Sequence, residues 1–209
     1  LNLRYKKKYL IVGVFVKICL EAAERAELTP KISIFPIKRS QKMFTTGNAD
    51  ALFPALRPTL PTDAYESEPF FFKDIHAVVL KNKEIPTDIE DLHGKTIGLV
   101  RGFSYPRIIT VNENIKIDYA NSQKTNLRKL ANGRIDIIVA DLKTVKPLLK
   151  NENLQGKIKF DSSEPFSRQP VFFAFQRNSK GKVLAEKFSK AIKSMKKDGT
   201  YDNILSELK

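Results

Sequence analysis

Residues 101–106, RGFSYP, carry groups that can hold an anion. They directly follow KTIGLV, which reads as a buried strand, so a turn there would present backbone N–H groups beyond the end of that strand. The candidate ligand-binding residues of the turn are Arg101, Gly102, Phe103, Ser104 and Tyr105. Gly102 permits close approach of the backbone, and the Ser104 hydroxyl can donate to a carboxylate. An ordinary strand-to-helix turn is the alternative, and the two aromatic residues are either pocket walls or plain packing residues.

Catalytic and metal-binding patterns are missing from the sequence. His76 and His93 lie on different predicted elements, and neither has a partner at the spacing of metal ligands. The sequence contains no Gly-x-Ser-x-Gly motif, no P-loop and no dinucleotide fingerprint. Cys19 lies in the apolar stretch VKICLEAA, which predicts a buried inert thiol. We therefore expect no enzymatic activity, no metal and no cofactor.

The charge of the chain is strongly basic, with a net charge of +14. A basic balance is compatible with nucleic acid, an anionic membrane or acidic ligands. The lysines are scattered in ones and twos, however, and the densest run, Lys6–Lys8, is short. No aromatic-interleaved RNA-binding signature or zinc-finger spacing occurs. We interpret most of this charge as solvated surface and expect no nucleic-acid partner.

The opening of the chain, RYKKKYLIVGVFVK, resembles a secretory signal in its basic residues and apolar run. Lys17 interrupts the apolar run after eight residues, and the run is too short to span a bilayer. The stretch instead predicts a short strand, a turn at Gly13 and a helix over residues 15–27, with one apolar face.

Strands and helices alternate along the rest of the chain, which predicts an α/β fold with largely parallel sheets. Near the end, DGTYDNILSEL predicts a break at Gly199 followed by a short packed helix with apolar residues at helical spacing. The predicted strands cover 31–37, 51–56, 70–80, 95–100, 135–141, 157–160 and 171–176, and the predicted helices cover 39–46, 88–94, 121–131 and 182–197.

Five segments, in this order, resemble those of the bacterial extracellular solute-binding proteins of the amino-acid-binding type (family 3). The resemblance covers nearly the whole chain, and each segment alone is a weak signal. The segments are GVFVKICLEAAERAEL, SEPFFF, IEDLHGKTIGLVRGFSY, LANGRIDIIVAD and DGTYDNILSEL.

This resemblance implies a two-lobed, type II periplasmic-binding-protein-like fold with a ligand clamped between the lobes. Lobe one would comprise residues 1–74 plus 171–209, and lobe two would be the inserted residues 75–170. Two crossing strands would join them, and binding would close the lobes by a hinge motion. The resemblance also implies a monomer that works beside the permease of a membrane transporter.

The resemblance further assigns candidate ligand contacts. It favours a binding role for residues 101–106, and it places Asp141 where a carboxylate pairs with a ligand amino group, although Asp141 can equally cap the next helix. The family's usual carboxylate-gripping arginine position holds Leu60, so we expect Arg57, three residues earlier, to substitute for it. This departure puts an α-amino-acid ligand in doubt. Arg39 is a candidate for the cleft lining, or an ordinary surface arginine.

A second departure concerns the start of the chain. By the resemblance, the sequence lacks the family's first central strand, and LNLRYKKKYLIVG aligns only with the hairpin that follows it. A missing central strand exposes unpaired backbone groups. We expect the chain to be incomplete, to receive that strand from elsewhere, or to be a decayed binder, with no signal peptide present.

The function implied is that of an extracytoplasmic or periplasmic solute-binding protein. It would capture a small polar, carboxylate-bearing molecule for uptake by an ABC-type transporter. Three alternatives remain open: the ligand-sensing domain of a membrane receptor, a dehydratase-like enzyme on the same fold, and the effector domain of a DNA-binding regulator. A transmembrane helix after Lys209 would favour the sensing domain of a receptor. Turnover of a prephenate-like acid would favour the dehydratase-like enzyme.

Overall fold

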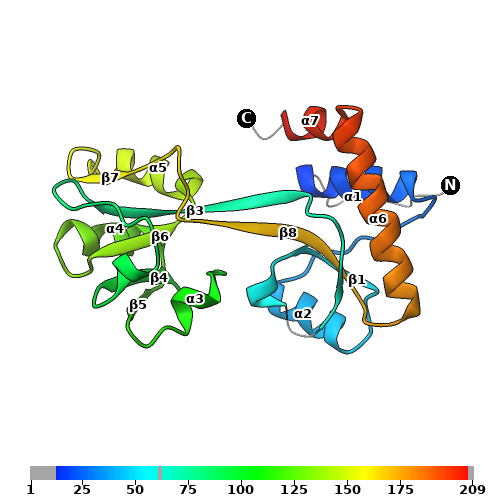
Figure 1. The fold of residues 1–209 in the computed structure, drawn as a ribbon, viewed down its shortest axis with the longest axis horizontal. Helices are drawn as coiled ribbons and strands as arrows, with labels where there is room; N and C mark the ends of the chain where they lie inside the picture. Colours follow the sequence, from blue (N-terminus) through cyan, green and yellow to red (C-terminus); the bar gives the residue numbers. More distant parts are fainter. Residues whose placement is uncertain (1–12, 61–62, 207–209) are drawn as a thin grey trace. The chain divides into compact units, whose positions relative to one another are not determined.

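The computed structural model describes residues 13–60 and 63–206 (Figure 1). The chain divides into two compact units, unit 1 of Leu1–Phe71 and Pro170–Lys209 and unit 2 of Phe72–Gln169. Two strands, β3 (Phe71–Leu80) and β8 (Ser167–Phe175), cross the boundaries between the units. The chain therefore passes from one unit to the other twice, each time along a strand. The strand expected before Gly13 lies outside the described residues.

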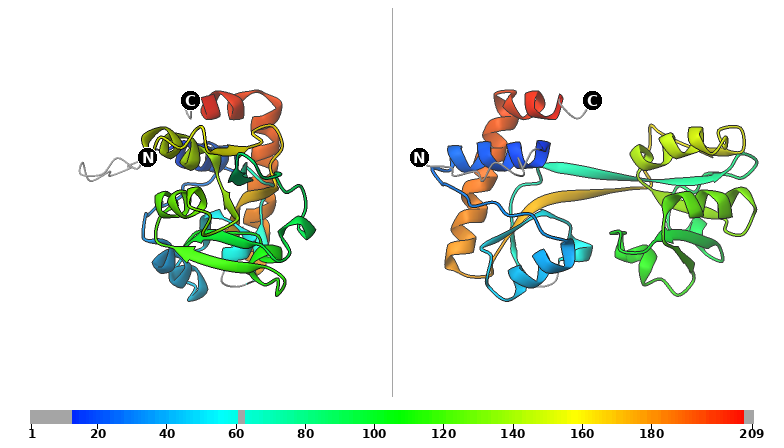
Figure 2. Two further views of the ribbon diagram at one scale, coloured as in Figure 1. Left: turned by 90° about the vertical axis from the view of Figure 1, so that its left-hand side faces the viewer. Right: turned by 180° about the vertical axis from the view of Figure 1, so that it is seen from behind.

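Unit 1 is built on β8, which pairs antiparallel with β1 (Ala51–Ala55) and with β2 (Tyr65–Glu66). Successive residues of a strand point to opposite faces, so β8 serves two cores. Phe173 and Phe175 pack with α1 (Val14–Arg25) and α6 (Ser179–Lys197), which also contact each other (Figure 2). The residues between them, Phe172 and Ala174, pack with Phe44 of α2 (Ile37–Thr45).

Unit 2 has β4 (Thr96–Val100) between two parallel neighbours, β5 (Lys116–Ala120) and β6 (Ile137–Ala140). β6 pairs antiparallel with β3, and β3 pairs antiparallel with β7 (Ile158–Phe160). The two faces of this sheet carry separate cores. One packs with α4 (Gln123–Ala131) and α5 (Leu142–Asn151), and the other with Tyr105 and with Ile109 of α3 (Arg107–Thr110).

Most of the predicted helices are present with small changes at their ends. The helix expected at 15–27 is α1, and the helix expected at 39–46 is α2. The helix expected at 121–131 is α4. The helix expected at 182–197 is α6, which begins three residues earlier than predicted. The element expected at 88–94 is a single 3₁₀ turn, Glu90–Leu92. Glycines end these elements as predicted, since Gly94, Gly133 and Gly199 have φ values of 72°, 66° and 80°.

Two predictions about strands are wrong. Residues 31–36 form neither helix nor strand, and Ile34 is 69% exposed, because an apolar alternation makes a strand only where a neighbour accepts its hydrogen bonds. The sheets are also not largely parallel. Among the pairings of the described strands, β4 with β5 and β4 with β6 are parallel, whereas the pairings of β1, β2 and β7 and of β3 with β6 are antiparallel.

The closing helix, α7 (Thr200–Leu205), docks onto unit 1 as the sequence predicts. Gly199 supplies the left-handed turn between α6 and α7. Tyr201, Ile204 and Leu205 pack against the core of α1 and α6, and the Tyr201 hydroxyl donates to the Phe70 carbonyl at 2.5 Å. The break in the helix thus redirects the chain onto α1.

A charged cluster secures the same corner. The Arg25 guanidinium of α1 donates to Asp198 at 2.6 Å and to the Thr200 hydroxyl at 2.9 Å. The hydrogen bond from Arg25, followed by those from Thr200, lowers the pKa of Asp198 from 3.8 to about 2. The folded state therefore favours the ionised carboxylate. The resulting stabilisation is complete above the unfolded pKa near 3.8 and disappears as the pH falls through 2.

We expect Asp198→Asn to reduce the loss of stability between pH 4 and pH 2. Urea denaturation of both proteins at pH 6, 4, 3 and 2.5 should show a difference in unfolding free energy that shrinks as the pH falls. Asp202→Asn removes the same charge from the neighbouring helix α7 and is the matched control for the change in net charge. An Asp198→Asn curve parallel to the wild-type curve over this range would contradict the assignment.

Candidate functional site

The candidate site of unit 2 lies at one edge of its sheet. β4 and β6 are parallel, so their carboxyl ends reach the same edge, where residues 101–106 follow β4 and Asp141 follows β6. β3 is antiparallel to β6, with His76 opposite Ala140, so it enters the sheet at this edge and brings Lys73 there. The carboxyl edge of such a sheet is where loops and helix N-termini expose ligand-binding groups.

Residues 100–105 form a closed turn. Gly102 has a φ of +80°, and a Cβ built at this position would meet no atom within 4 Å, so the conformation rather than the space requires glycine. The N–H of Phe103 donates to the Val100 carbonyl at 3.3 Å. The Val100 N–H in turn donates to the Tyr105 hydroxyl at 2.9 Å. Tyr105 is 6% exposed, and burial raises its pKa. Its ring packs in the core, and its hydroxyl fixes the turn.

We expect Tyr105→Phe to lower the free energy of unfolding by about 1–2 kcal/mol, because the buried Val100 N–H loses its acceptor. Urea denaturation followed by circular dichroism measures this change. Tyr119→Phe is the control in the same unit, since Tyr119 is 41% exposed, and it should change stability little. A Tyr105→Phe protein as stable as the wild type would show that the hydroxyl does not hold the turn.

Ser104 and Lys73 join the turn to β3. The Lys73 ammonium donates to the Ser104 carbonyl at 3.3 Å. Among residues 13–60 and 63–206, the enclosed Ser104 hydroxyl oxygen finds no hydrogen-bond partner, so its capacity to donate is unused. Burial lowers the pKa of Lys73, and the nearby charge of Asp141 opposes that shift. Lys73 was not among the predicted site residues, although a lysine within the apolar run FFFKDIHAVVL is a usable signal.

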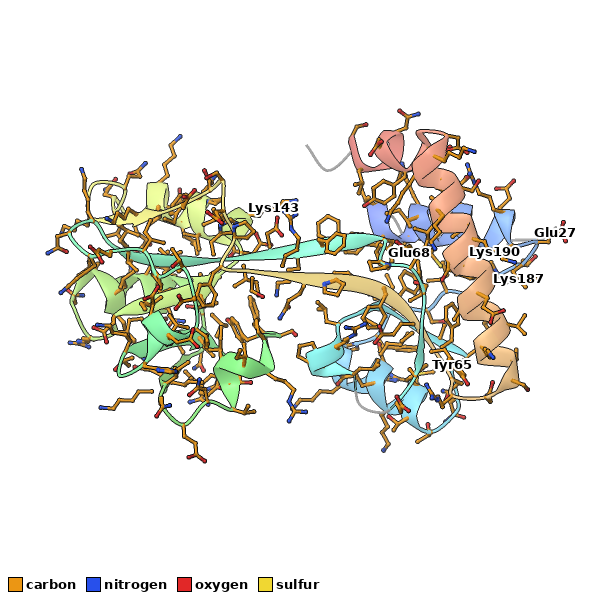
Figure 3. The ribbon with its side chains drawn as sticks, in the orientation of Figure 1. Glu27, Tyr65, Glu68, Lys143, Lys187 and Lys190 are labelled. Carbon is orange, nitrogen blue, oxygen red and sulfur yellow. The ribbon has the colours of Figure 1, made fainter. Side chains whose placement is uncertain are left out.

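Asp141 is the N-cap residue of α5. Its Oδ1 accepts the backbone N–H of Lys143 at 2.8 Å, and Figure 3 labels Lys143 in the first turn of that helix. Its backbone carbonyl accepts the Thr144 hydroxyl at 2.7 Å. Asp141 therefore caps α5, which is one of the two roles that the sequence left open for it. Capping also fixes the carboxylate at the sheet edge, where it interacts with the charge of Lys73.

The two remaining residues of the turn are more exposed. The Arg101 guanidinium carbon lies 5.4 Å from the centre of the Tyr119 ring, and Phe103 is 53% exposed. Tyr119 belongs to β5, the parallel neighbour of β4. Arg101 and Tyr119 thus form one exposed cation–π pair beside the turn, and Phe103 presents an exposed ring next to it.

Arg57 and Arg39 lie in unit 1. Arg57, in the 3₁₀ turn Arg57–Thr59, holds the Glu66 carboxylate through Nε at 3.0 Å and Nη2 at 2.8 Å. The hydrogen bonds that Arg57 donates to Glu66 raise the pKa of Arg57. The guanidinium carbon of Arg39 lies 4.4 Å from the centre of the Phe35 ring. Leu60 packs against the core around Phe44. Because Arg57 holds the Glu66 carboxylate, its charge is already matched by an acidic neighbour.

Groups that could support other chemistry have structural roles. His76 is 7% exposed, and its Nδ1 lies 2.8 Å from the Asp161 carbonyl oxygen. Burial raises the pKa of Cys19 to about 12, which makes the thiol unreactive. Over residues 13–60 and 63–206, no group of three or more His, Cys, Asp or Glu side chains has metal-site geometry. The same residues contain no helix that is both apolar and long enough to cross a membrane.

Comparison with known proteins gives a consistent set of relatives, although no protein-family model matches the chain. It is 22% identical over 205 residues to the probable amino-acid-binding protein YxeM of Bacillus subtilis, covering 96% of this chain and 76% of YxeM. It is 28% identical over 200 residues to the L-cystine-binding protein TcyA of the same organism, covering 93% of this chain and 71% of TcyA. It is 30% identical over 143 residues to a probable histidine-binding protein of Campylobacter jejuni, covering 68% of this chain and 54% of that protein.

Solved structures share the fold. An ancestral arginine-binding protein bound to arginine matches with a TM-score of 0.64 and 24% identity, over 94% of this chain and 87% of that one. The GluR0 ligand-binding core in complex with L-glutamate matches with a TM-score of 0.67 and 13% identity, over 94% and 89%. At these identities the likeness establishes the fold.

Proposed function

We propose a solute-binding function for this chain, which is a homologue of the amino-acid-binding proteins of ABC transporters and has the type II periplasmic-binding-protein fold. It captures a small polar, carboxylate-bearing molecule outside the cytoplasm and delivers it to the permease of an ABC-type transporter. It acts as a monomer, without catalysis, and the closing of the two units on the ligand provides the signal for delivery.

One observation carries this proposal: the enclosed Ser104 hydroxyl, at the carboxyl edge of the sheet of unit 2, has no partner in the part of the chain that the structure describes. A buried polar group without a partner is costly to a fold, and a ligand that accepts its hydrogen bond removes that cost. The left-handed Gly102 exposes backbone next to it, and Asp141 adds a fixed charge at the same edge. The proposed ligand contacts are the turn residues 101–104 with Asp141, and Arg57 and Arg39 from unit 1.

A thermal-shift panel of amino acids, organic acids and polyamines tests the proposal. A ligand at 100 times its dissociation constant should stabilise the folded chain by about 2.7 kcal/mol. Ser104→Ala should weaken the response to the same compound. Ser162→Ala, an exposed serine of the same unit, should leave it unchanged. Absence of a response from every compound would contradict a solute-binding function.

The ligand-sensing domain of a membrane receptor is the second candidate. The match to the GluR0 ligand-binding core favours it, because that core shares the fold over most of both chains. Ligand binding alone does not separate a sensor from a transport protein. Sequencing of the complete gene does: a transmembrane helix encoded in continuity with this chain would favour the sensor, and a neighbouring permease gene would favour transport.

A further inference from the structure

Lys73 places a positive charge inside the proposed ligand site. It lies two residues before Ile75, and side chains two residues apart on a strand point to the same face. Ile75 is 1% exposed and belongs to the core that includes Tyr105. Lys73 therefore emerges on the face that the 101–106 turn covers, and its ammonium is held by the Ser104 carbonyl at 3.3 Å.

Asp141 is the natural counter-charge of this lysine. The pairing of β3 with β6 ends at His76 and Ala140, so Lys73 and Asp141 both leave the sheet at the same edge. The carboxylate is fixed in place by the N–H of Lys143, and its charge acts on the Lys73 ammonium. Lys73 is partly buried, so the attraction between the two groups is stronger than between fully exposed charges.

The two charges together set what the site can accept. A carboxylate that faces only solvent would attract a ligand ammonium, but here the protein supplies an ammonium of its own. A second ammonium beside Asp141 would be repelled by Lys73 and would compete with it for the attraction of the carboxylate. The carboxylate of a ligand has no such competitor at the Ser104 hydroxyl.

Two residues of unit 1 also argue against an α-amino acid as the ligand. The sequence carries Leu60 where the resemblance implies a carboxylate-gripping arginine, and Leu60 packs against a hydrophobic core. Arg57, the expected substitute, holds Glu66 through two of its nitrogens. Leu60 carries no charge, and a ligand carboxylate would have to compete with Glu66 for Arg57.

We propose that Lys73 is a specificity-determining residue, a built-in positive charge at the same sheet edge as Asp141 that makes the site select carboxylic acids without an α-ammonium group. The inference rests on the proposed solute-binding function and deepens it, because it names the ligand class. The ligand carboxylate is held by the turn and by Ser104, and Lys73 replaces the ligand's amino group at Asp141.

Isothermal titration of the whole chain with matched ligand pairs tests the inference. The pairs differ only in the α-ammonium: L-glutamate and glutarate, L-histidine and 3-(imidazol-4-yl)propionate, and L-arginine and 5-guanidinopentanoate. In the pair that binds best, the wild type should prefer the acid without the ammonium by tenfold or more. Lys73→Met should shift that ratio towards the amino acid by at least tenfold, about 1.4 kcal/mol. Lys73→Arg should preserve the preference.

Two further variants keep the test independent of folding defects. Asp141→Asn retains a capping side chain but leaves the Lys73 charge unmatched, so it should tighten binding of the ammonium-free acid and weaken binding of the amino acid. Lys83→Met, an exposed lysine of the same unit, should leave every ratio unchanged.

The possible outcomes are distinct. A wild type that prefers the amino acid in every pair that binds, or a ratio unaffected by Lys73→Met and Asp141→Asn, would overturn the inference while leaving a solute-binding function intact. A folded chain that binds no member of any pair, and no compound of the wider panel, would overturn both.

Discussion

Replacing Phe173 by alanine should lower the free energy of unfolding by about 3–5 kcal/mol, because the substitution empties the centre of the core of unit 1. Phe173 is 1% exposed. Its ring centre lies 4.5 Å from that of Phe70 and 5.0 Å from those of Phe53 and Phe188. These four rings come from four separate segments of the chain, so the cavity cannot be filled by a shift of one element.

Urea denaturation monitored by circular dichroism measures the loss. Phe72→Ala is the matched control, because Phe72 is 46% exposed and lies on the neighbouring strand β3. It should change stability by less than about 1 kcal/mol. If the two substitutions had similar effects, the ring cluster would not be the centre of the core.

Replacing Gly181 by alanine should destabilise the protein by about 3 kcal/mol, at the upper end of the range for overpacking. Alanine in place of a helical glycine usually stabilises by roughly 0.5–1 kcal/mol, so the expected sign is reversed. A Cβ at this position of α6 would lie 1.9 Å from the carbonyl oxygen of Gln176 and 2.9 Å from its carbonyl carbon. The obstacle is backbone and cannot rotate away.

Gln176 is also fixed by its own hydrogen bonds. Its N–H donates to the Asp50 carbonyl at 3.2 Å, and its side-chain amide donates to the carbonyls of Phe44 and Ala49. The start of α6 would have to move instead, against the core formed with β8. Thermal and urea denaturation of Gly181→Ala should show this loss. Gly156→Ala, where a Cβ meets nothing within 4 Å, should be near neutral, and equal stabilities of the two variants would argue against the clash.

Local patterns in the sequence predict the helices and their glycine stops well, because periodicity and left-handed glycines act over a few residues. The pairing of strands depends on distant partners. The alternation at residues 31–37 therefore gave a wrong prediction, and β5 was not predicted, although its residues Lys116–Ala120 alternate charged and apolar side chains. The parallel expectation overlooked that β1 and β2 both run antiparallel to β8.

The candidate site could be predicted only in part. The turn after β4 and the acid after β6 follow from the rule that parallel strands expose their carboxyl ends together. The inward role of the Tyr105 hydroxyl, the pairing of Arg57 with Glu66 and the position of Lys73 could not be predicted, because each depends on which side chains tertiary packing brings within reach. The aromatic residues Phe103 and Tyr105 were left open, and only the second is buried.

The insertion of unit 2 into unit 1 fixes an order of events during synthesis on the ribosome. Residues 72–169 form a contiguous segment whose cores contain no part of α6 or α7, so this unit can fold as soon as it has emerged. The core around α1 includes Phe173, Phe188 and Met195, which are made after unit 2. Helix α1 must therefore wait, with its apolar face uncovered, until the chain has been translated as far as Met195.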